Sequence, residues 1–570
     1  MARMRALAGL VILFSWYLSS VVVAYGLLWF GLFCLRNVRV ALDTGLYMFV
    51  FYAAPAALSI AALIVGNVVR SVLPLAPVRE DSLPLSRAEA PALWRMVDES
   101  AERIGARPPA QVRLIMDANA AAVERTALLG LLGGERLLYV GVPLMIMLDA
   151  DELRAVLAHE LGHDAARHTR FSALTIRASH ALDVTLRQAR ADLRTTGMLR
   201  RCQRIALGPL LLFAAVYHHT VLPARREHEF AADRAAVKVV GTEVMLRALH
   251  AYHAANRAWH DFSLRLLHPS LAMGVIPDDP FAAFAAVVDQ PHYRQGLHAF
   301  REAPLPFARK DGPNPHPSLT ERAERLRRGE PTDAPSGSEP TPKPLDDALE
   351  LASLLARTPW ARAEALPAAG CLRTTPWPQW LSSVGESASA RQVDRLLRAV
   401  SRVAPAEQIL AGVPPSLVLQ SVGSRRQQLV QREAALGRRM APREGERWLA
   451  EATAALIQRL LVADGQATWR VEWGAAVVAD CPALERGELD ALVSAVLAAQ
   501  RGGTELRHRL EDLGLDLDTA LTPTGPVSSA QDRWNVQEER TPWSVKAART
   551  VGALALVLLL IASSAHLFAG

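Results

Sequence analysis

Cysteine is scarce in this sequence, with four residues among 570. They are widely spaced and form no CxxC pair, which argues against a disulfide scaffold and against a zinc site built from thiolates. Charged residues make up only 21% of the chain against 51% hydrophobic residues, a balance that disfavours both a disordered chain and an ordinary soluble enzyme. Because 63 basic residues are nearly offset by 57 acidic ones, we expect no nucleic-acid partner.

Charge is absent from three long stretches of the sequence. Residues 6–35 and 44–69 are uncharged, and a helix that crosses a bilayer needs about 20 apolar residues. We therefore expect a transmembrane hairpin within residues 1–78. A third uncharged stretch, 550–570, predicts a C-terminal transmembrane helix. Arg and Lys residues flank these stretches on the sides that face the large central region, which favours a cytoplasmic location for that region.

The central region divides by composition. Residues 79–328 mix short β-like runs with helical periodicity and predict one domain. Residues 329–347 are rich in Pro, Ser, Gly and acidic residues and are typical of a linker. Residues 348–521 are rich in Ala, Leu and Arg with apolar residues three and four apart, which predicts a helical accessory domain that could bind a protein partner. Residues 522–549 form a polar tether.

The most specific motif is HExxH, formed by His159, Glu160 and His163. Positions i and i+4 share one face of a helix, so both imidazoles can approach one zinc ion while Glu160 projects toward a bound water as general base. Asp149 can cap this helix with Glu152 as its capping-box partner. The motif alone is compatible with two structural histidines, so a third ligand is needed to support a metal site.

A third ligand is available later in the chain. A catalytic zinc ion takes three protein ligands and keeps one position open. Glu229 lies in the segment RREHEFAADRAA, with Asp233 one helical turn later. This helix could give one carboxylate to zinc and a second to a ligating imidazole. Glu227 and His228 are close enough in sequence to be rival ligands.

An apolar segment, 205–224, separates the two halves of this site. A single crossing there would place His163 and Glu229 on opposite sides of a hydrocarbon core about 30 Å thick, and they could not share a metal. We therefore expect the segment to be re-entrant, interfacial or buried in protein, with bends at Pro209 and Pro223.

Four motifs together resemble the membrane-bound M48 peptidase family, which includes a bacterial heat-shock protease and the eukaryotic CAAX prenyl protease. They are DANAAA at 117–122, HELGH at 159–163, EFAAD at 229–233 and HPSLTER at 316–322. The resemblance spans about residues 112–326 and leaves the accessory region uncovered. It implies a zincin-like α+β metalloprotease domain with an HExxH helix, a glutamate helix and a small β-sheet, set in a mainly α membrane protein.

The resemblance also implies a role for each motif residue. The implied zinc ligands, for one Zn²⁺ per chain, are His159, His163 and Glu229, with Glu160 as general base and Asp233 as the partner of a ligating imidazole. Asn119 and Ala120 would lie at an edge strand that binds an extended peptide by β-augmentation.

The late motif supplies two further candidates. The resemblance implies that His316 and Arg322 donate to the developing oxyanion. A second HPSL copy begins at His268, but it has Gly274 where the first has its arginine. We therefore favour the copy at His316.

These patterns predict a zinc-dependent endopeptidase of a bacterial inner membrane with a cytoplasmic active site. Its substrates would be membrane-associated or misfolded polypeptides. The alternative is an inactive membrane scaffold whose zinc site is structural or empty. A structural site would need a closed fourth ligand, and His168 is the nearby candidate, although it lies off the face that carries His163.

Overall fold

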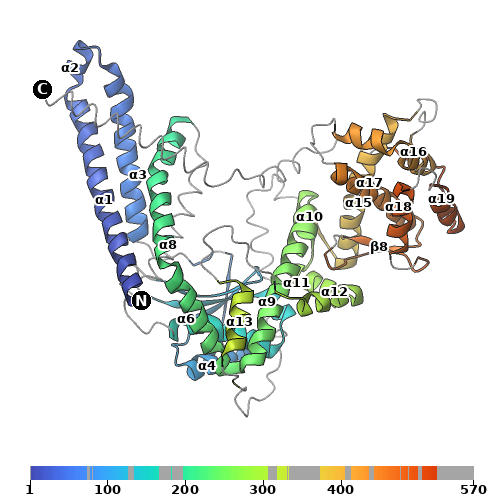
Figure 1. Cartoon of the computed structure of the whole chain (residues 1–570), viewed down its shortest axis with the longest axis horizontal. Helices are drawn as coiled ribbons and strands as arrows, with labels where there is room; N and C mark the ends of the chain where they lie inside the picture. The colour runs from blue at the N-terminus through green and yellow to red at the C-terminus, as the bar shows by residue number, and fades with distance from the viewer. Residues whose placement is uncertain are drawn as a thin grey trace. The chain divides into compact units, whose positions relative to one another are not determined.

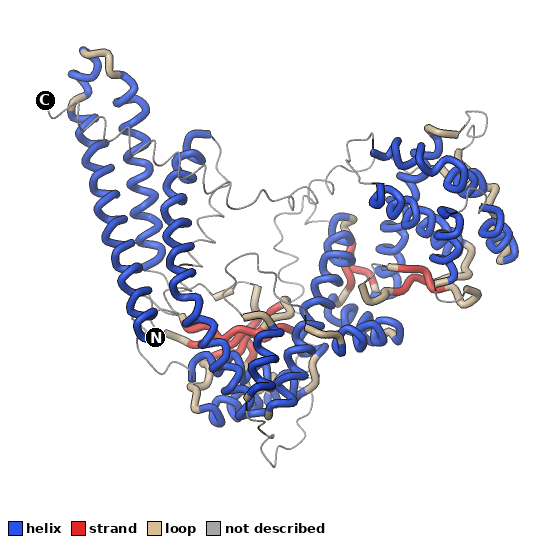
Figure 2. Tube along the Cα trace, in the orientation of Figure 1, coloured by secondary structure: helices blue, strands red, loops and turns tan. Residues whose placement is uncertain are grey.

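The computed structural model is mostly helical with small sheets (Figures 1 and 2). The residues it describes are 2–72, 78–79, 81–125, 134–165, 182, 197–305, 317–329, 332, 373–404, 412–434, 442–474, 477–484, 487–498 and 503–522. The predicted C-terminal transmembrane helix, the polar tether beyond 522 and nearly all of the linker lie outside this part. The described residues fall into two compact units, one within 1–255 and 303–355 and the other within 256–302 and 356–536.

The first unit begins with a helical hairpin. Helices α1 (Ala2–Arg36) and α3 (Ala54–Val72) pack side by side, joined by α2 (Val38–Asp43) and the π-helical turn η1 (Phe49–Ala53) (Figure 1). The absence of a side chain at Gly31 permits this packing, because a Cβ there would lie 2.6 Å from Cγ of Leu58. The predicted hairpin of helices is therefore present, although a short helix occupies much of the connection.

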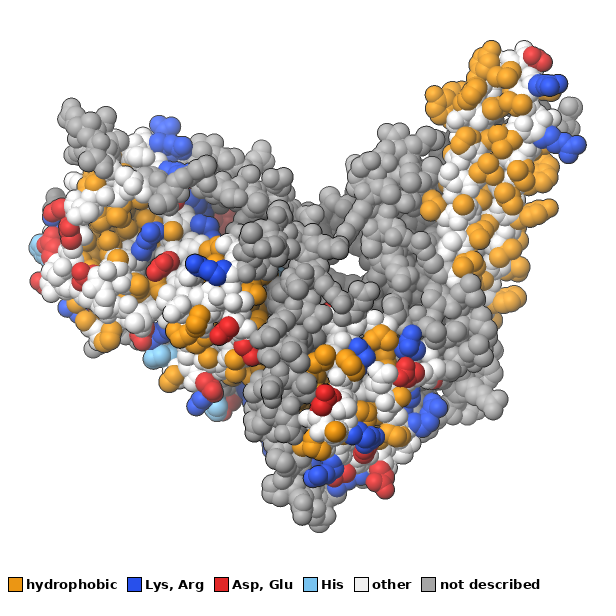
Figure 3. All heavy atoms as spheres, turned by 180° about the vertical axis from the view of Figure 1, so that it is seen from behind, with side chains coloured by type: hydrophobic (Ala, Val, Ile, Leu, Met, Phe, Trp, Pro, Cys, Tyr) orange, Lys and Arg blue, Asp and Glu red, His pale blue; other side chains and the backbone are white. Residues whose placement is uncertain are grey.

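Large apolar side chains are exposed along this hairpin. Phe14 is 71% exposed and Trp29 is 59% exposed, and nearly all the exposed large apolar residues lie between 11 and 69. Figure 3 shows these side chains covering the hairpin, with charged side chains gathered at its tip. Among the described residues, one helix, Val11–Arg36, is long and apolar enough to cross a membrane, and the apolar helix Val50–Gly66 is shorter.

Helix α8 (Gly197–Val240) is continuous across the apolar segment that the sequence predicts to be re-entrant, interfacial or buried. It runs for 44 residues, so the helix continues through Pro209 and Pro223 and contains no re-entrant turn. Its first half packs against α1 and α3, and Phe213 stacks on Trp16 of α1 with ring centroids 4.5 Å apart. Contacts with neighbouring helices offset the hydrogen bonds that proline removes.

A four-stranded sheet lies at the base of the first unit (Figure 2). Its strand order is β1 (Leu83–Leu85), β2 (Gln111–Ile115), β4 (Arg136–Gly141) and β3 (Ala120–Glu124). Strands β2 and β4 are parallel, whereas β1 and β3 pair antiparallel with their neighbours. Strand β3 is therefore an edge strand, and it contacts helix α6.

Helices pack around this sheet and around one another. They are α4 (Pro91–Ile104), α5 (Val142–Met147), α6 (Ala150–Ala165), the second half of α8, α9 (Thr242–Phe262) and α13 (Leu319–Arg328). A cluster of mostly small buried residues joins α6, α8, α9 and α13, among them Ala158, Ala236, Ala248 and Ala323. The alanines in this cluster let the helices approach one another closely near the residues predicted as ligands on α6 and α8.

The second unit combines two parts of the sequence. From the first part come η4 (Ser263–Leu267), α10 (His268–Ala272), β5 (Val275–Pro277), α11 (Pro280–Asp289) and α12 (Pro291–Glu302). From the second come β6 (Arg373–Thr375), α15 (Trp377–Ser401), α16 (Pro415–Ala434), α17 (Pro442–Ala463), β7 (Thr468–Arg470), β8 (Val478–Asp480), α18 (Glu488–Ala498) and α19 (Gly503–Asp512). The C-terminal helices share one hydrophobic core.

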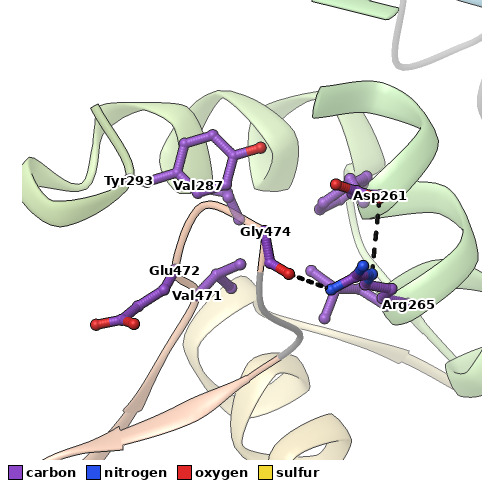
Figure 4. A pocket seen from close by; sticks show the side chains of 9 residues that line it. Asp261, Arg265, Val287, Tyr293, Val471, Glu472 and Gly474 are labelled. Atoms are coloured by element: carbon purple, nitrogen blue, oxygen red, sulfur yellow. Dashed lines mark hydrogen bonds and ion pairs between the residues drawn. The ribbon is translucent and has the colours of Figure 1, made fainter. Parts of the chain in front are cut away.

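The two parts of this unit are joined by a strand pair and by side-chain contacts. Strand β5 pairs in parallel with β6. Figure 4 shows a small pocket lined by residues of both parts, in which Arg265 Nη1 donates to the carbonyl of Gly474 at 2.5 Å. Residues 256–302, which the sequence boundaries assign to the protease domain, thus pack with the predicted accessory helices.

Candidate metal centre

Helix α6 begins with the capping box expected from its sequence. The Glu152 amide donates to Asp149 Oδ1 at 2.7 Å, and the Asp149 amide donates to Glu152 Oε2 at 3.1 Å. Leu153 and Leu157 are buried at 1% and 0% exposure, so one face of the helix is fixed against the core. This anchoring sets the rotation of α6 and hence the direction in which the HExxH side chains project.

Close packing of α6 on α8 brings the two motif helices together. Gly162 lies at the contact, where a Cβ would be 3.0 Å from Cβ of Ala235 and 3.2 Å from Cα of Ala232. Both alanines belong to α8 and are buried. A glycine between the two histidines of HExxH, facing alanines on the partner helix, thus permits a backbone approach that a larger residue would prevent.

The predicted ligands converge across this contact. The Nε2 atom of His159 lies 3.6 Å from Oε2 of Glu229, and the Nε2 atom of His163 lies 3.9 Å from Oε1 of the same carboxylate. The three donor atoms all lie within 4.8 Å of one another. Two imidazole nitrogens and one carboxylate oxygen are a donor set typical of catalytic zinc, so the residues present fit such an ion.

The carboxylate of Asp233 contacts the imidazole of His159 on its Nδ1 side. Asp233 Oδ1 lies 2.9 Å from His159 Nδ1, on the ring edge opposite the nitrogen that faces Glu229. Asp233 is 2% exposed, and burial alone would raise its pKa. Hydrogen bonding to His159 and the charge of Arg322 outweigh burial and lower the pKa of Asp233 to about 2. An ionised carboxylate at this position fixes the tautomer that leaves Nε2 available to a metal.

Arg322 projects from α13 toward this carboxylate. Its Nε lies 3.0 Å from Asp233 Oδ2, and its Nη2 lies 2.5 Å from Asp233 Oδ1 and 3.2 Å from His159 Nδ1. All these contacts are on the Nδ1 side of His159, away from the converging ligand atoms. These contacts show that Arg322 positions Asp233, and its predicted role as an oxyanion donor stays a prediction.

Glu160 lies between the ligands and the sheet. Burial raises the pKa of its carboxyl, and the charge of Glu229 adds to this effect, although His159 opposes it. The carboxylate Oε2 accepts a hydrogen bond of 3.3 Å from the backbone amide of Ala122 in β3. Glu160 therefore connects the HExxH helix directly to the edge strand.

The backbone groups of the edge strand β3 point alternately toward β4 and toward the open edge of the sheet. The Gly141 amide donates to the Asn119 carbonyl, and the Arg125 amide donates to the Glu135 carbonyl, across β3 and β4. Because these bonds recur at every second residue of an antiparallel pair, the odd-numbered residues of β3 face β4. The backbone groups of Ala122 point instead to the open edge, in agreement with its contact to Glu160.

The predicted substrate-binding residues begin this strand. Asn119 is exposed and Ala120 is buried. The hydroxyl of Tyr252 donates to Asn119 Oδ1 at 2.9 Å, so α9 fixes the orientation of the amide. The sequence analysis did not identify Tyr252, which belongs to no motif and lies 133 residues beyond Asn119.

The two rival ligands on α8 have other contacts. Glu227 is exposed and forms an ion pair with Arg325 at 3.0 Å, which directs its carboxylate away from the converging donors. His228 Nδ1 lies 3.0 Å from Nδ1 of His163, behind that ring. Neither belongs to the group of donors that the described residues bring together.

Three histidines of the sequence analysis are not placed at this centre. His316 and His168 lie outside the described residues. His268 begins α10 and belongs to the second compact unit. The proposed oxyanion role of His316 thus stays a prediction.

The family model described as Peptidase family M48 matches residues 88–330. No curated protein and no solved structure matches the chain. The matched region contains every predicted site residue, and its sheet and HExxH helix fit a zincin-like fold.

Proposed function

Because this chain belongs to peptidase family M48 through residues 88–330, we propose that it is a zinc-dependent endopeptidase integral to a membrane. The observation that carries the proposal is the convergence of His159, His163 and Glu229 from two helices, with donor atoms within 4.8 Å. Two helices that pack through Gly162 hold these donors together in a buried site.

The residues around this centre have different roles in the proposed reaction. When bound, zinc supplies a Lewis acid and an activated water at neutral pH. Glu160 would serve as the general base, taking a proton from the attacking water and passing it to the leaving amine; burial raises the pKa of its carboxyl. Asp233 accepts from Nδ1 of His159 and is itself held by Arg322, so the pair keeps the imidazole in place. His316 is proposed as a donor to the developing oxyanion.

An extended polypeptide is the substrate that the edge strand accommodates. Alternate backbone groups of β3 point away from β4, and Ala122 among them lies beside Glu160. The Ala122 amide already donates to Glu160, so a peptide added along this edge would pair with the other outward backbone groups and pass the base. The donor contact from Tyr252 keeps Asn119 at the start of this path. Membrane-associated or misfolded proteins supply such extended segments.

The hairpin of α1 and α3 is proposed to anchor the enzyme in a bacterial inner membrane. Its exposed apolar surface would be costly in water and matches a lipid environment. The first half of α8 packs on the same helices and leaves Leu212 and Val216 exposed at 56% and 49%. Basic residues near the hairpin ends favour a cytoplasmic metal centre.

Metal analysis combined with proteolysis tests this function. The full chain purified in detergent should contain one zinc per chain and cleave an unfolded protein such as casein, and a chelator should abolish cleavage. Glu160→Gln should retain zinc but turn over at least about 10²-fold more slowly, because it removes the proton acceptor and not a ligand. Zinc-loaded wild-type protein without any proteolytic activity would favour the scaffold alternative.

Accessibility labelling tests the orientation. In a cysteine-free background, single cysteines that replace Arg39 and Glu227 should react with a membrane-impermeant reagent in different preparations. One should label in right-side-out vesicles and the other in inside-out vesicles. We expect Glu227 to label from the cytoplasmic face. Labelling of both positions from one face would contradict the proposed anchoring.

A further inference from the structure

His163, the second histidine of the HExxH motif, contacts the imidazole of His228 on its Nδ1 side. Nδ1 of His163 lies 3.0 Å from Nδ1 of His228, and the two rings are nearly parallel, with centroids 5.0 Å apart and planes 13° apart. His228 immediately precedes the proposed ligand Glu229 on α8. The adjacent side chains thus reach different nitrogens of the same ring, since Nε2 of His163 faces Glu229.

This contact restricts the protons of the two rings. A metal at Nε2 of His163 requires that nitrogen to be unprotonated, so the proton of the neutral ring is on Nδ1. The Nδ1–H group then donates to Nδ1 of His228, which must be an acceptor and must carry its own proton on Nε2. Only this pair of tautomers gives a metal-binding His163 and a hydrogen bond between the rings.

We infer that His228 is a positioning residue for the metal centre, which holds His163 in its ligating tautomer and orientation by accepting the Nδ1 proton. This inference rests on the proposed metallopeptidase function. It gives α8 three tasks within six residues: Glu229 binds the metal, Asp233 holds His159 and His228 holds His163. The two ligating imidazoles thus have different partners at Nδ1. His159 contacts an ionised carboxylate, and His163 contacts a neutral imidazole.

Zinc affinity of substituted full-length proteins tests the inference. His228→Ala removes the acceptor, and the dissociation constant for zinc, measured by competition with a chromophoric chelator, should rise about 10-fold or more, within the 10–100-fold range of outer-shell partners. His228→Phe keeps a ring for stacking but has no acceptor, so it should weaken binding as much as His228→Ala. His228→Asn places an oxygen near the position of Nδ1 and should restore affinity to within about threefold of wild type.

A spectroscopic measurement adds a readout that packing alone would not change. In the cobalt-substituted protein, the visible absorption bands of the metal should shift in His228→Ala and His228→Phe and return toward the wild-type positions in His228→Asn. Glu227→Gln is the matched control, because the adjacent Glu227 is exposed and paired with Arg325. It should leave affinity and spectrum unchanged.

The outcomes separate this inference from the function on which it rests. If wild-type protein binds no zinc, the proposed function itself fails. If wild type binds zinc and His228→Ala binds it equally well, the positioning role is wrong while the metal site stands. Equal weakening in His228→Ala, His228→Phe and His228→Asn would also overturn the inference, since the acceptor would then be irrelevant. Far-UV circular dichroism of each variant establishes that folding is retained, and His228→Asn keeps the test decisive if His228→Ala does not fold.

Discussion

The two halves of α8 differ in what they bury. Before about residue 224, aromatic and aliphatic side chains such as Phe213 and Tyr217 pack against α1, while Leu212 on the outer face is exposed. After it, the helix buries charge, with Glu229 at 7% and Asp233 at 2% exposure. The first half therefore contributes apolar packing, and the second half contributes polar contacts whose geometry decides whether a metal can bind.

One continuous helix can therefore serve two environments if its buried face changes chemistry along its length. Substitutions on the buried face of the second half should alter metal binding, and substitutions in the first half should alter stability alone. The following experiments test this division, beginning with the largest expected effect on the metal.

Removal of the carboxylate ligand should have the largest effect. Glu229→Gln is expected to weaken zinc binding by more than the 10–100-fold typical of outer-shell changes, because one of only three protein ligands loses its charge. Equilibrium dialysis followed by metal analysis would measure this. Glu227→Gln is the control and should bind zinc as wild type does, and the reverse order would place the ligand on another face of α8.

Arg322→Ala should have the next largest effect. It leaves the buried carboxylate of Asp233 without its cation and releases His159, so zinc affinity should fall about 10–100-fold. Arg325→Ala, on the exposed side of the same helix, is the control. Wild-type zinc affinity combined with a rate loss of about 10²–10³-fold would instead support the oxyanion role predicted from the sequence.

Gly162→Ala tests the contact between α6 and α8. The added methyl group would meet Ala232 and Ala235 at 3.0–3.2 Å, and overpacking typically costs about 1–3 kcal/mol. The higher helix propensity of alanine offsets about 1 kcal/mol. We expect a small net loss in stability by thermal unfolding and a weaker zinc site. Gly66→Ala meets no atom within 4 Å and should not destabilise the protein.

Tyr217→Ala should leave the metal centre unchanged. The ring is fully buried and lies 5.7 Å from that of Phe213, so its removal should cost about 3 kcal/mol of stability, as for other large aromatic truncations. Leu212→Ala, at an exposed position of the same half, should cost much less. A lower zinc affinity in Tyr217→Ala would show that the two halves of α8 are coupled.

The sequence was most informative where the interactions are local. The capping box of Asp149 and Glu152 depends on residues three apart, and the capping residues of α6 take the positions that the motif predicts. Helical periodicity likewise places Asp233 on the same face of α8 as Glu229, one turn later. The contact of Asp233 with His159 joins α8 to α6, so it does not follow from local periodicity alone.

Features that depend on distant parts of the chain were predicted less well. The prolines of α8 suggested a re-entrant segment, but α8 is one continuous helix that packs on α1 and α3. The contact of Tyr252 with Asn119 joins residues 133 positions apart, and no pattern in the sequence relates them. Residues 256–302 lie within the stretch that matches the family model, yet their pairing with β6 crosses a composition boundary, and no pattern in the sequence predicts that contact.

The continuity of α8 also sets how far the metal ligand lies from the apolar cluster shared with α1. Val221 is the last residue of α8 in the apolar cluster shared with α1, and Glu229 follows it by eight residues, or about 12 Å of helix at 1.5 Å per residue. Because α8 is continuous between these points, the metal ligand lies within that length of helix from the anchoring bundle. Under the proposed anchoring, the scissile bond must come equally close to this bundle. Juxtamembrane segments of other membrane proteins satisfy this requirement directly, whereas a folded soluble domain would have to be unfolded first.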